Sequence, residues 1–220
     1  MIQHHPDEEF LLPLAAGHLR AGQAVVVSTH LENCAECRAR LYTLQAVGGA
    51  LLEESEPVAL QAGAWERTLL RIERATAEPA GPAAVPAPLP HPALPENVSW
   101  PASLRGCRVT DWRFMGPGMR YARVTVPHDP EATLYLLRIG EGRSLPRHTH
   151  SGIEFTQVLC GTFDDGRAVF GPGDFDAADE EVHHQPVVQP GATCVCLAYV
   201  GARMRFDGRI ASLIGGLIGM

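Results

Sequence analysis

Lysine is absent from this 220-residue sequence, and all 18 basic residues are arginine. Acidic residues number 25, so the formal net charge is −7, and no strong basic patch is visible along the chain. A protein whose main ligand is nucleic acid usually carries a basic surface, so we expect no direct nucleic-acid partner. An acidic surface is better suited to a basic region on another protein.

Long apolar runs are also missing. The most apolar stretch, residues 210–220, contains glycines and falls well short of the ~20 residues that a membrane helix requires. The first residues are histidines and acids rather than a basic segment followed by an apolar one. We therefore expect no secretory signal, no membrane partner and a cytoplasmic location. Six cysteines in such a protein favour metal binding over a disulfide framework.

What the sequence does contain is a compact ligand motif, His30-x-x-x-Cys34-x-x-Cys37. On a helix, His30 and Cys34 would share one face, and Cys37 could close on the same point. One imidazole and two thiolates suit Zn²⁺, and a structural zinc site takes four protein ligands. The fourth could come from His5 or from its neighbour His4. Such a zinc-stapled helical domain is more typical of a regulatory binding module than of an enzyme.

A proline-rich segment divides the chain. Seven prolines lie between residues 77 and 95, a density that excludes a helix and favours extended polyproline II. We interpret residues 77–96 as a semi-rigid linker. It separates a helical zinc-binding domain at residues 1–76 from a second domain at residues 97–220.

The segment before the linker has the apolar periodicity of four helices. The first follows Pro6, begins with acidic residues and is bracketed at its end by Gly17 and Gly22. The other three are expected at residues 23–31, 35–54 and 60–76. A domain this small has a small hydrophobic core, so a bound metal ion would contribute substantially to its stability. These helices also carry more large apolar residues than four short helices need internally, and these residues either fill the bundle core or form a partner surface.

After the linker, short apolar segments alternate with glycine and proline turns, a pattern typical of an all-β sandwich or barrel. The expected strands lie at residues 107–114, 120–126, 133–139, 154–159, 162–170, 183–188 and 193–200. The predicted fold class is thus α + β in two domains: a small zinc-stapled four-helix domain and a C-terminal all-β barrel.

A second group of metal ligands lies in this β half. His148 and His150 are two residues apart, so on a strand they project to one face, and Glu154 can return to the same point after a short turn. A later histidine, His183 or His184, could complete a site of three histidines and one carboxylate. Adjacent residues on a strand point to opposite faces, so only one of that pair can enter the cavity.

These residues carry a family resemblance. From Gly142 to Gly161 the chain matches the first cupin motif, G-x5-H-x-H-x3,4-E-x6-G, in full. The second cupin motif is matched only in part, by Pro172-Gly173 and the later histidines. The N-terminal motif is similar to that of zinc-binding anti-sigma domains, which share H-x-x-x-C-x-x-C and an upstream histidine. As a whole, the chain resembles the ChrR subfamily of anti-sigma factors.

The resemblance implies site residues in both halves. The zinc ligands of the helical domain would be His5, His30, Cys34 and Cys37. The cupin ligands would be His148, His150, Glu154 and His184, with His183 as the alternative to His184. The cupin ligand set accepts Zn²⁺ and also Mn, Fe or Ni ions.

The resemblance also implies a function in transcription regulation. The helical domain would wrap an extracytoplasmic-function sigma factor in a 1:1 complex and block its access to RNA polymerase. The cupin domain would be the sensor of singlet oxygen or related oxidants, and the signal would end with release of the sigma factor.

The main alternative is an enzyme, because cupins with three histidines and a glutamate also serve as dioxygenases and related catalysts. A stand-alone cupin enzyme has no need of a zinc module and a proline tether, so we expect no enzyme. Cys194 and Cys196 are interpreted as core residues, and a redox role for them or for Cys160 is the weaker hypothesis. The acidic run at residues 174–181 is interpreted as a solvated loop.

Overall fold

The computed structural model describes residues 1–77, 89–96, 98–127, 129–202 and 204–207. Most of the proline-rich segment and the apolar tail at residues 210–220 therefore lie outside the described residues. The expectation of polyproline II falls largely there, and the boundaries at residues 76 and 97 stay predictions.

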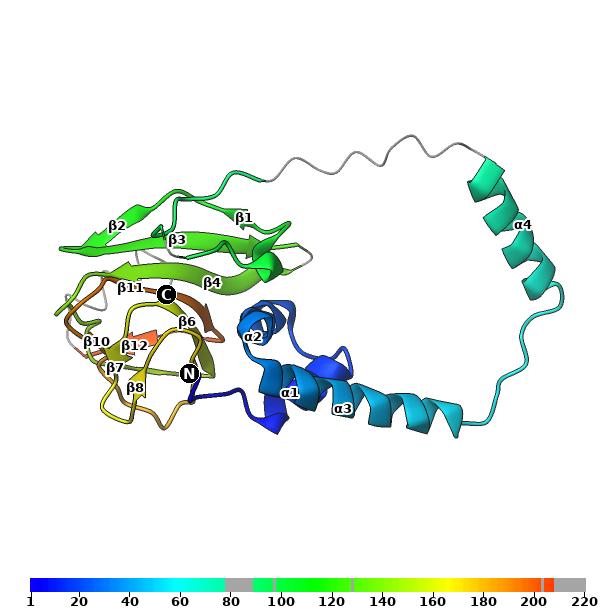
Figure 1. Ribbon diagram of the computed structural model, residues 1–220, viewed down its shortest axis with the longest axis horizontal. Coiled ribbons are helices and arrows are strands. Elements are labelled where there is room, and N and C mark those ends of the chain that lie inside the picture. The colour runs from blue at the N-terminus through cyan, green and yellow to red at the C-terminus, as the bar shows by residue number, and fades with distance from the viewer. Residues whose placement is uncertain (78–88, 97, 128, 203, 208–220) are drawn as a thin grey trace.

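Four helices precede the proline-rich segment, as the sequence predicts (Figure 1). They are α1 (Glu8–Ala15), α2 (Ala21–Asn33), α3 (Ala35–Glu53) and α4 (Ala64–Ala77). Helix α1 has Glu8 and Glu9 in its first turn, where acids suit the helix dipole, and it ends before Gly17, whose φ is 71°.

Two helix starts differ from the prediction. Helix α4 begins at Ala64 instead of residue 60, and α2 begins at Ala21 and includes Gly22. Gly22 lies inside the helix because the helix approaches the sheet there: a Cβ atom would come within 2.9 Å of the Tyr199 ring. The glycine thus permits close packing rather than ending a helix.

The C-terminal half is all β, again as predicted. Its strands are β1 (Arg108–Val109), β2 (Arg113–Gly116), β3 (Met119–Val126), β4 (Asp129–Ile139), β5 (His148–His150), β6 (Glu154–Cys160), β7 (Phe163–Asp164), β8 (Val169–Phe170), β9 (Phe175–Ala178), β10 (Val187–Val188), β11 (Cys194–Val200) and β12 (Met204–Phe206). The 3-10 helix η1 (Ala102–Leu104) leads into them.

Hydrogen bonds divide these strands into three antiparallel sheets. The largest has seven strands in the order β1-β3-β4-β11-β6-β9, with β2 paired to β3. A three-stranded sheet, β10-β7-β8, and a pair, β12-β5, form the opposite layer. Between the layers lies an apolar core that includes Tyr135, Leu137, Val158 and Phe163.

Three expected strands are interrupted. Residues 107–114 divide into β1 and β2, and residues 162–170 form the hairpin β7–β8 around Gly166, which has a φ of 88°. Residues 183–188 form only a bridge at His184 and then β10, because Pro186 between them has no N–H to donate. The second and third interruptions follow from local turn chemistry that a count of apolar residues does not capture.

Helices α1–α3 do not form a core of their own. Helix α2 lies on the large sheet, and α1 and α3 lie beside it (Figure 1). Val26 and Val27 of α2 and Leu11 of α1 belong to one buried cluster with Phe155 and Leu197 of the sheet. The thin core expected for the helical segment is thus completed by the sheet.

Helix α4 lies apart from the sheet and from the other helices (Figure 1). It presents Trp65, Leu69, Leu70 and Ile72 at its surface, with Trp65 67% exposed. A helix with this much exposed apolar surface is typical of one that packs against another protein.

Candidate metal centres

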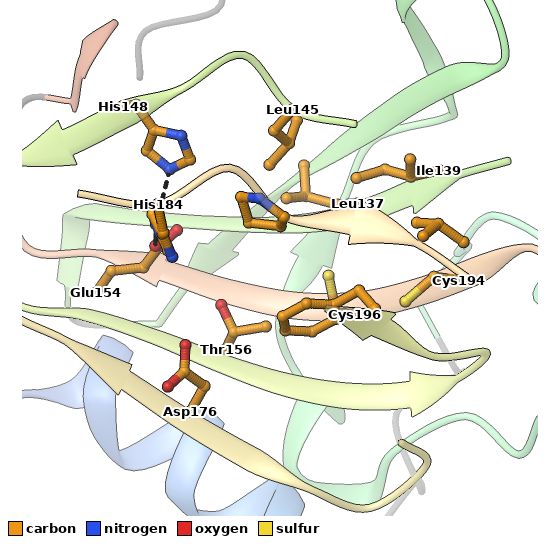
Figure 2. A pocket seen from close by; sticks show the side chains of 13 residues that line it. Leu137, Ile139, Leu145, His148, Glu154, Thr156, Asp176, His184, Cys194 and Cys196 are labelled. Atoms are coloured by element: carbon orange, nitrogen blue, oxygen red, sulfur yellow. Dashed lines mark hydrogen bonds and ion pairs between the residues drawn. The ribbon is translucent and has the colours of Figure 1, made fainter. Parts of the chain in front are cut away.

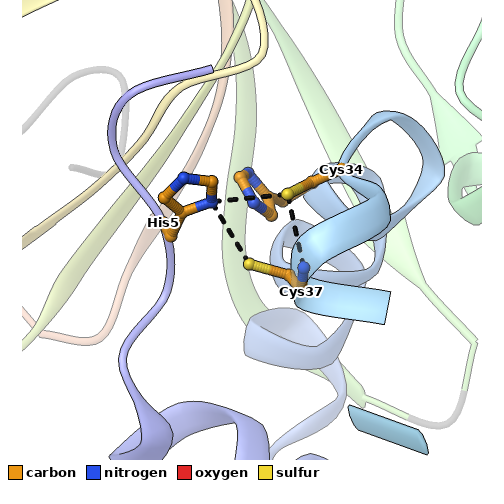
Figure 3. Close-up of side chains that lie close together, drawn as sticks. His5, Cys34 and Cys37 are labelled. Carbon is orange, nitrogen blue, oxygen red and sulfur yellow. Dashed lines mark hydrogen bonds between the residues drawn. The ribbon is translucent and has the colours of Figure 1, made fainter. Parts of the chain in front are cut away.

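The N-terminal motif places four potential ligands around one point. His5 precedes α1, His30 lies in the last turn of α2, and Cys34 and Cys37 lie at the start of α3. Cys34 is the single non-helical residue between the two helices, with φ −103° and ψ 104°. This break turns the chain so that both cysteines face His5, as Figure 3 shows.

The four ligand atoms of this N-terminal cluster lie within 4.8 Å of one another. His5 Nδ1 is 3.3 Å from the Cys34 sulfur and 3.3 Å from the Cys37 sulfur. The Cys37 backbone N–H donates a hydrogen bond of 3.4 Å to the Cys34 sulfur. Burial raises the pKa of the Cys37 thiol to about 12, so an incoming metal ion must displace its proton.

His30 shows that the cluster fits a metal ion. Its Nδ1 lies 3.0 Å from the Gly173 carbonyl oxygen and 3.2 Å from Gln157 Oε1. Both are acceptors, so Nδ1 carries the proton and Nε2 keeps its lone pair. That Nε2 atom is buried and has no hydrogen-bond partner among the described residues. Burial, followed by the nearby His5, lowers the pKa of His30, which favours the neutral ring that metals bind.

The second group of potential ligands lies between the two β layers. His148 and His150 belong to β5, Glu154 is the first residue of β6, and His184 forms an isolated bridge with His148. These four side chains are buried, and their ligand atoms lie within 4.8 Å of one another. The structure brings His184 to this cupin cluster, whereas the His183 side chain is exposed.

The Glu154 carboxylate contacts two imidazoles of the cupin cluster; Figure 2 draws it beside His184 and His148. Glu154 Oε2 is 2.9 Å from His150 Nε2 and 3.5 Å from His184 Nε2. His184 Nε2 is also 3.1 Å from His148 Nε2. Three imidazole nitrogens and one carboxylate oxygen therefore converge on a single point, the donor set of a cupin metal site.

The protonation states within the cupin cluster differ from residue to residue. Burial lowers the pKa of His148 to about 4. Burial would lower the pKa of His184 as well, but hydrogen bonds with Asp165 and Glu154 raise it to about 9. For Glu154, burial is outweighed by hydrogen bonds from His150 and His184, which lower its pKa. Near neutral pH the cluster therefore holds a proton on His184 beside the Glu154 carboxylate.

Known proteins are similar to this chain in sequence and fold. Residues 104–203 match the ChrR cupin-like domain family. Over 215 residues the chain is 40% identical to the anti-sigma-E factor ChrR of Cereibacter sphaeroides, covering 97% of this chain and 96% of that protein. This chain belongs to the ChrR family of anti-sigma factors.

A solved structure supports this membership. The crystal structure of Rhodobacter sphaeroides SigE in complex with the anti-sigma ChrR matches the chain with a TM-score of 0.71 and 38% identity. The match covers 91% of this chain and 99% of that chain. The ChrR resemblance seen in the sequence is therefore confirmed, together with the cupin fold of the C-terminal half.

In this ChrR-family chain, an outer layer of polar residues orients the cupin cluster. His148 Nδ1 donates to the Pro146 carbonyl oxygen at 2.7 Å, and His184 Nδ1 lies 3.4 Å from Asp165 Oδ2. Arg167 Nε donates to Asp165 Oδ2 at 2.7 Å. Such partners fix which ring nitrogen would face a metal ion.

Sequence reasoning missed Asp165, Arg167 and Gln157. Asp165 and Arg167 flank Gly166, where polar residues are common in any turn, so no local signal separates them from an ordinary loop.

The solvated-loop interpretation of residues 174–181 is wrong for Asp174 and Asp176, which are buried, although residues 179–181 are exposed. Burial raises the pKa of Asp176 to about 6, and Arg167 donates to its Oδ2 at 2.7 Å.

A cavity of about 30 Å³ adjoins the cupin cluster. Its lining is mostly apolar, and Cys194 and Cys196 both contribute to it (Figure 2). A hydrogen bond with Cys194, together with burial, raises the pKa of the Cys196 thiol. Buried and protonated thiols pack as small apolar side chains, which agrees with interpreting this pair as core residues.

His4 is not part of the N-terminal cluster. Its ring contacts Phe170, with the two ring centroids 4.5 Å apart. The structure thus places His5, and not His4, in the N-terminal cluster, a choice that the motif alone left open.

None of the helices in the described part of the chain combines the length and apolar character needed to cross a membrane.

Proposed function

We propose that the protein is a zinc-stapled anti-sigma factor that holds an extracytoplasmic-function sigma factor in a 1:1 complex and so regulates transcription. The observation that carries the proposal is the 40% identity over 97% of the chain to an anti-sigma factor. The related ChrR crystallises in complex with SigE, which supports a partner of the same kind. Because sigma factors act on RNA polymerase, the proposal places the protein in the cytoplasm.

The exposed apolar surface of the helical half supports this partner. Large side chains of α3, the following loop and α4 are exposed: Tyr42, Val47, Leu51, Leu52, Val58, Leu60, Trp65, Leu69, Leu70 and Ile72. Trp65 and Leu52 are exposed by 67% and 74%. Exposed apolar side chains in this number mark a protein interface, and an amphipathic helix such as α4 suits a helical partner.

We assign Zn²⁺ to the N-terminal cluster, because two imidazoles and two thiolates are a donor set that structural zinc sites use. The proposed ligands are His5, His30, Cys34 and Cys37. For the cupin cluster the proposed ligands are His148, His150, Glu154 and His184, which accept Zn²⁺ or an Mn, Fe or Ni ion.

In this proposal the cupin half is the sensor of an oxidative, singlet-oxygen-like signal. A change at the cupin cluster would shift the balance between a state that holds the sigma factor and a state that releases it. His148→Ala should therefore leave sigma binding intact and abolish oxidant-dependent release. A variant that still releases the sigma factor would contradict the assignment of the sensor.

The cupin cavity favours a sensor over an enzyme. Pockets that bind small organic substrates usually enclose about 300–1,000 Å³. The cavity beside the cupin cluster has about 30 Å³, room for a water molecule or a diatomic gas. A metal-dependent dioxygenase acting on an organic substrate, the alternative function, would have to use instead the open cavity of about 580 Å³, which His184 lines and the other three residues of the cupin cluster do not.

Co-expression with the organism's extracytoplasmic-function sigma factors tests the proposal. The full chain should co-purify with one of them as a stable 1:1 complex, and the double variant Cys34→Ser/Cys37→Ser should lose both zinc and the partner. His183→Ala is the control, because its exposed side chain lies outside both clusters. Turnover of a small oxidisable substrate with no sigma partner would favour the enzyme instead.

A further inference from the structure

Both histidines of the N-terminal cluster are held by the β half. His30 donates from Nδ1 to the Gly173 carbonyl oxygen, 3.0 Å away, and to Gln157 Oε1, 3.2 Å away. Gln157 is 1% exposed, and its Nε2 is fixed by a 3.1 Å hydrogen bond to the Val158 carbonyl oxygen. The orientation of His30 therefore depends on residues that lie more than 120 positions later in the chain.

The segment that carries His5 is held in the same way. The Asp174 carboxylate accepts hydrogen bonds from the backbone N–H groups of Gln3 and His4, at 2.6 and 3.1 Å. The Phe175 N–H donates back to the His4 carbonyl oxygen at 3.1 Å. These three bonds attach the N-terminal segment to the start of β9, directly before His5. Cys34 and Cys37 are thus the two members of the cluster that the helices position by themselves.

The same two strands also carry the cupin cluster and its cavity. On β6, Glu154 belongs to the cupin cluster, and Gln157, three residues later, points to the opposite face toward His30. On β9, Asp176 lines the cupin cavity, while the neighbouring Phe175 binds the N-terminal segment. Strands β6 and β9 pair with each other, so a displacement of either reaches both clusters.

We propose that Gln157 and Asp174 are positioning residues for the N-terminal metal centre, so that the cupin sheet sets how tightly this centre holds its ion. Through β6 and β9, a change at the cupin cluster would alter the geometry of His30 and His5. The inference rests on the proposed assignment of a metal to the N-terminal cluster and goes beyond it, because sigma binding plays no part in it.

The test measures metal release from the N-terminal centre of the full-length protein. Cobalt bound there gives thiolate-to-metal charge-transfer absorption, which the cupin cluster of three histidines and one glutamate does not give. With a chelator in excess, Gln157→Leu should speed the loss of this signal about tenfold, the lower end of the usual effect on metal affinity, because the Gly173 carbonyl oxygen still accepts from His30. Gln189→Leu, the same change at a half-buried glutamine far from His30, should release cobalt like the unaltered protein.

A second variant keeps the test decisive if Gln157→Leu fails to fold. Asp174→Ala removes the acceptor for Gln3 and His4 and should also speed cobalt release, whereas Asp179→Ala, at an exposed acid of the same run, should not. Release rates unchanged in the folded variants would overturn the inference. No charge-transfer signal in the unaltered protein would instead remove the metal assignment on which it rests.

Discussion

At the scale of single residues, the most instructive pair is His183 and His184. The two are adjacent and of the same type, so spacing alone leaves both open as ligands, and the ChrR resemblance favours His184. In the structure His184 is 4% exposed and lies 3.1 Å from His148, while His183 is exposed. Adjacent residues of an extended segment face opposite ways, so only His184 enters the cupin cluster.

The pair gives a matched test of the cupin centre. His184→Ala should lower the metal content of the purified protein by one equivalent, because it removes one of four ligands. His183→Ala should keep the full metal content. Elemental analysis of both proteins, purified side by side, measures the difference, and equal metal content would rule out His184 as a ligand.

His184 should also determine how metal binding at the proposed cupin site responds to pH. Because its pKa is raised to about 9, an ion that binds near neutral pH must displace its proton. The proton competes below the raised pKa, so the apparent affinity should rise about tenfold per pH unit up to about pH 9 and then level off. His148 adds no such step near neutral pH, because burial lowers its pKa to about 4.

Calorimetry in buffers of different ionisation enthalpy measures this proton directly. We expect release of about one proton from His184 per cupin ion near neutral pH, on a protein whose N-terminal centre is already filled with zinc. A heat of binding that is independent of the buffer would show that His184 is not protonated and would contradict this prediction.

At the scale of helices and strands, spacing in the sequence predicts what lies within one element. The two-residue separation of His148 and His150 predicted a shared strand face, and both side chains are buried in one cluster on β5. The partners of Gln157 and Asp174 could not be predicted in this way. They lie 127 and about 170 residues away in sequence, and only the packing of the N-terminal segment on the sheet brings them together.

Helix α4 is the element whose role depends most on a partner. Trp65 is 67% exposed, so Trp65→Ala should change the free energy of unfolding of the free protein by no more than about 0.5 kcal/mol. In the complex, a buried tryptophan anchor typically contributes at least about 2 kcal/mol, so the sigma factor should bind about 30-fold more weakly.

Titration of the labelled sigma factor measures this change in affinity. Phe114→Ala is the control, because Phe114 is an aromatic residue that is 74% exposed on β2, away from the helices. Loss of affinity in Phe114→Ala but not in Trp65→Ala would place the sigma-binding surface on the cupin half instead.

At the scale of the whole molecule, the two halves share a core that the sequence did not predict. Composition and the proline-rich segment indicate two separate units. However, Val26 and Val27 of α2 are fully buried in one cluster with Phe155 and Leu197 of the sheet. Glu32 of α2 also accepts hydrogen bonds from the backbone of Ser103 at 2.7 Å and of the preceding residue at 2.9 Å. The periodicity of the sequence identifies the apolar face of a helix, but it does not identify the surface against which that face packs.

This shared core predicts that α1–α3 and the sheet unfold together, and Gly22 offers the sharpest test. A Cβ atom at Gly22 would lie 2.9 Å from the Tyr199 ring and 3.0 Å from the Ala132 Cβ, so Gly22→Ala must push α2 away from β4 and β11. Overpacking of this kind costs about 1–3 kcal/mol. Gly48→Ala is the control, because Gly48 lies inside α3 with nothing within 4 Å, and alanine there should stabilise the helix by about 0.5–1 kcal/mol.

Urea unfolding, followed both by circular dichroism of the helices and by fluorescence of the tryptophans near the sheet, distinguishes the two possible outcomes. If the core is shared, Gly22→Ala lowers the midpoint of a single transition that both signals report, because displacing α2 uncovers the sheet residues beneath it. If the helices and the sheet were independent, the helical signal alone would shift and the fluorescence midpoint would stay in place. That second result would show that the proposed N-terminal metal centre is independent of the sheet, which contacts His30 and the backbone directly before His5.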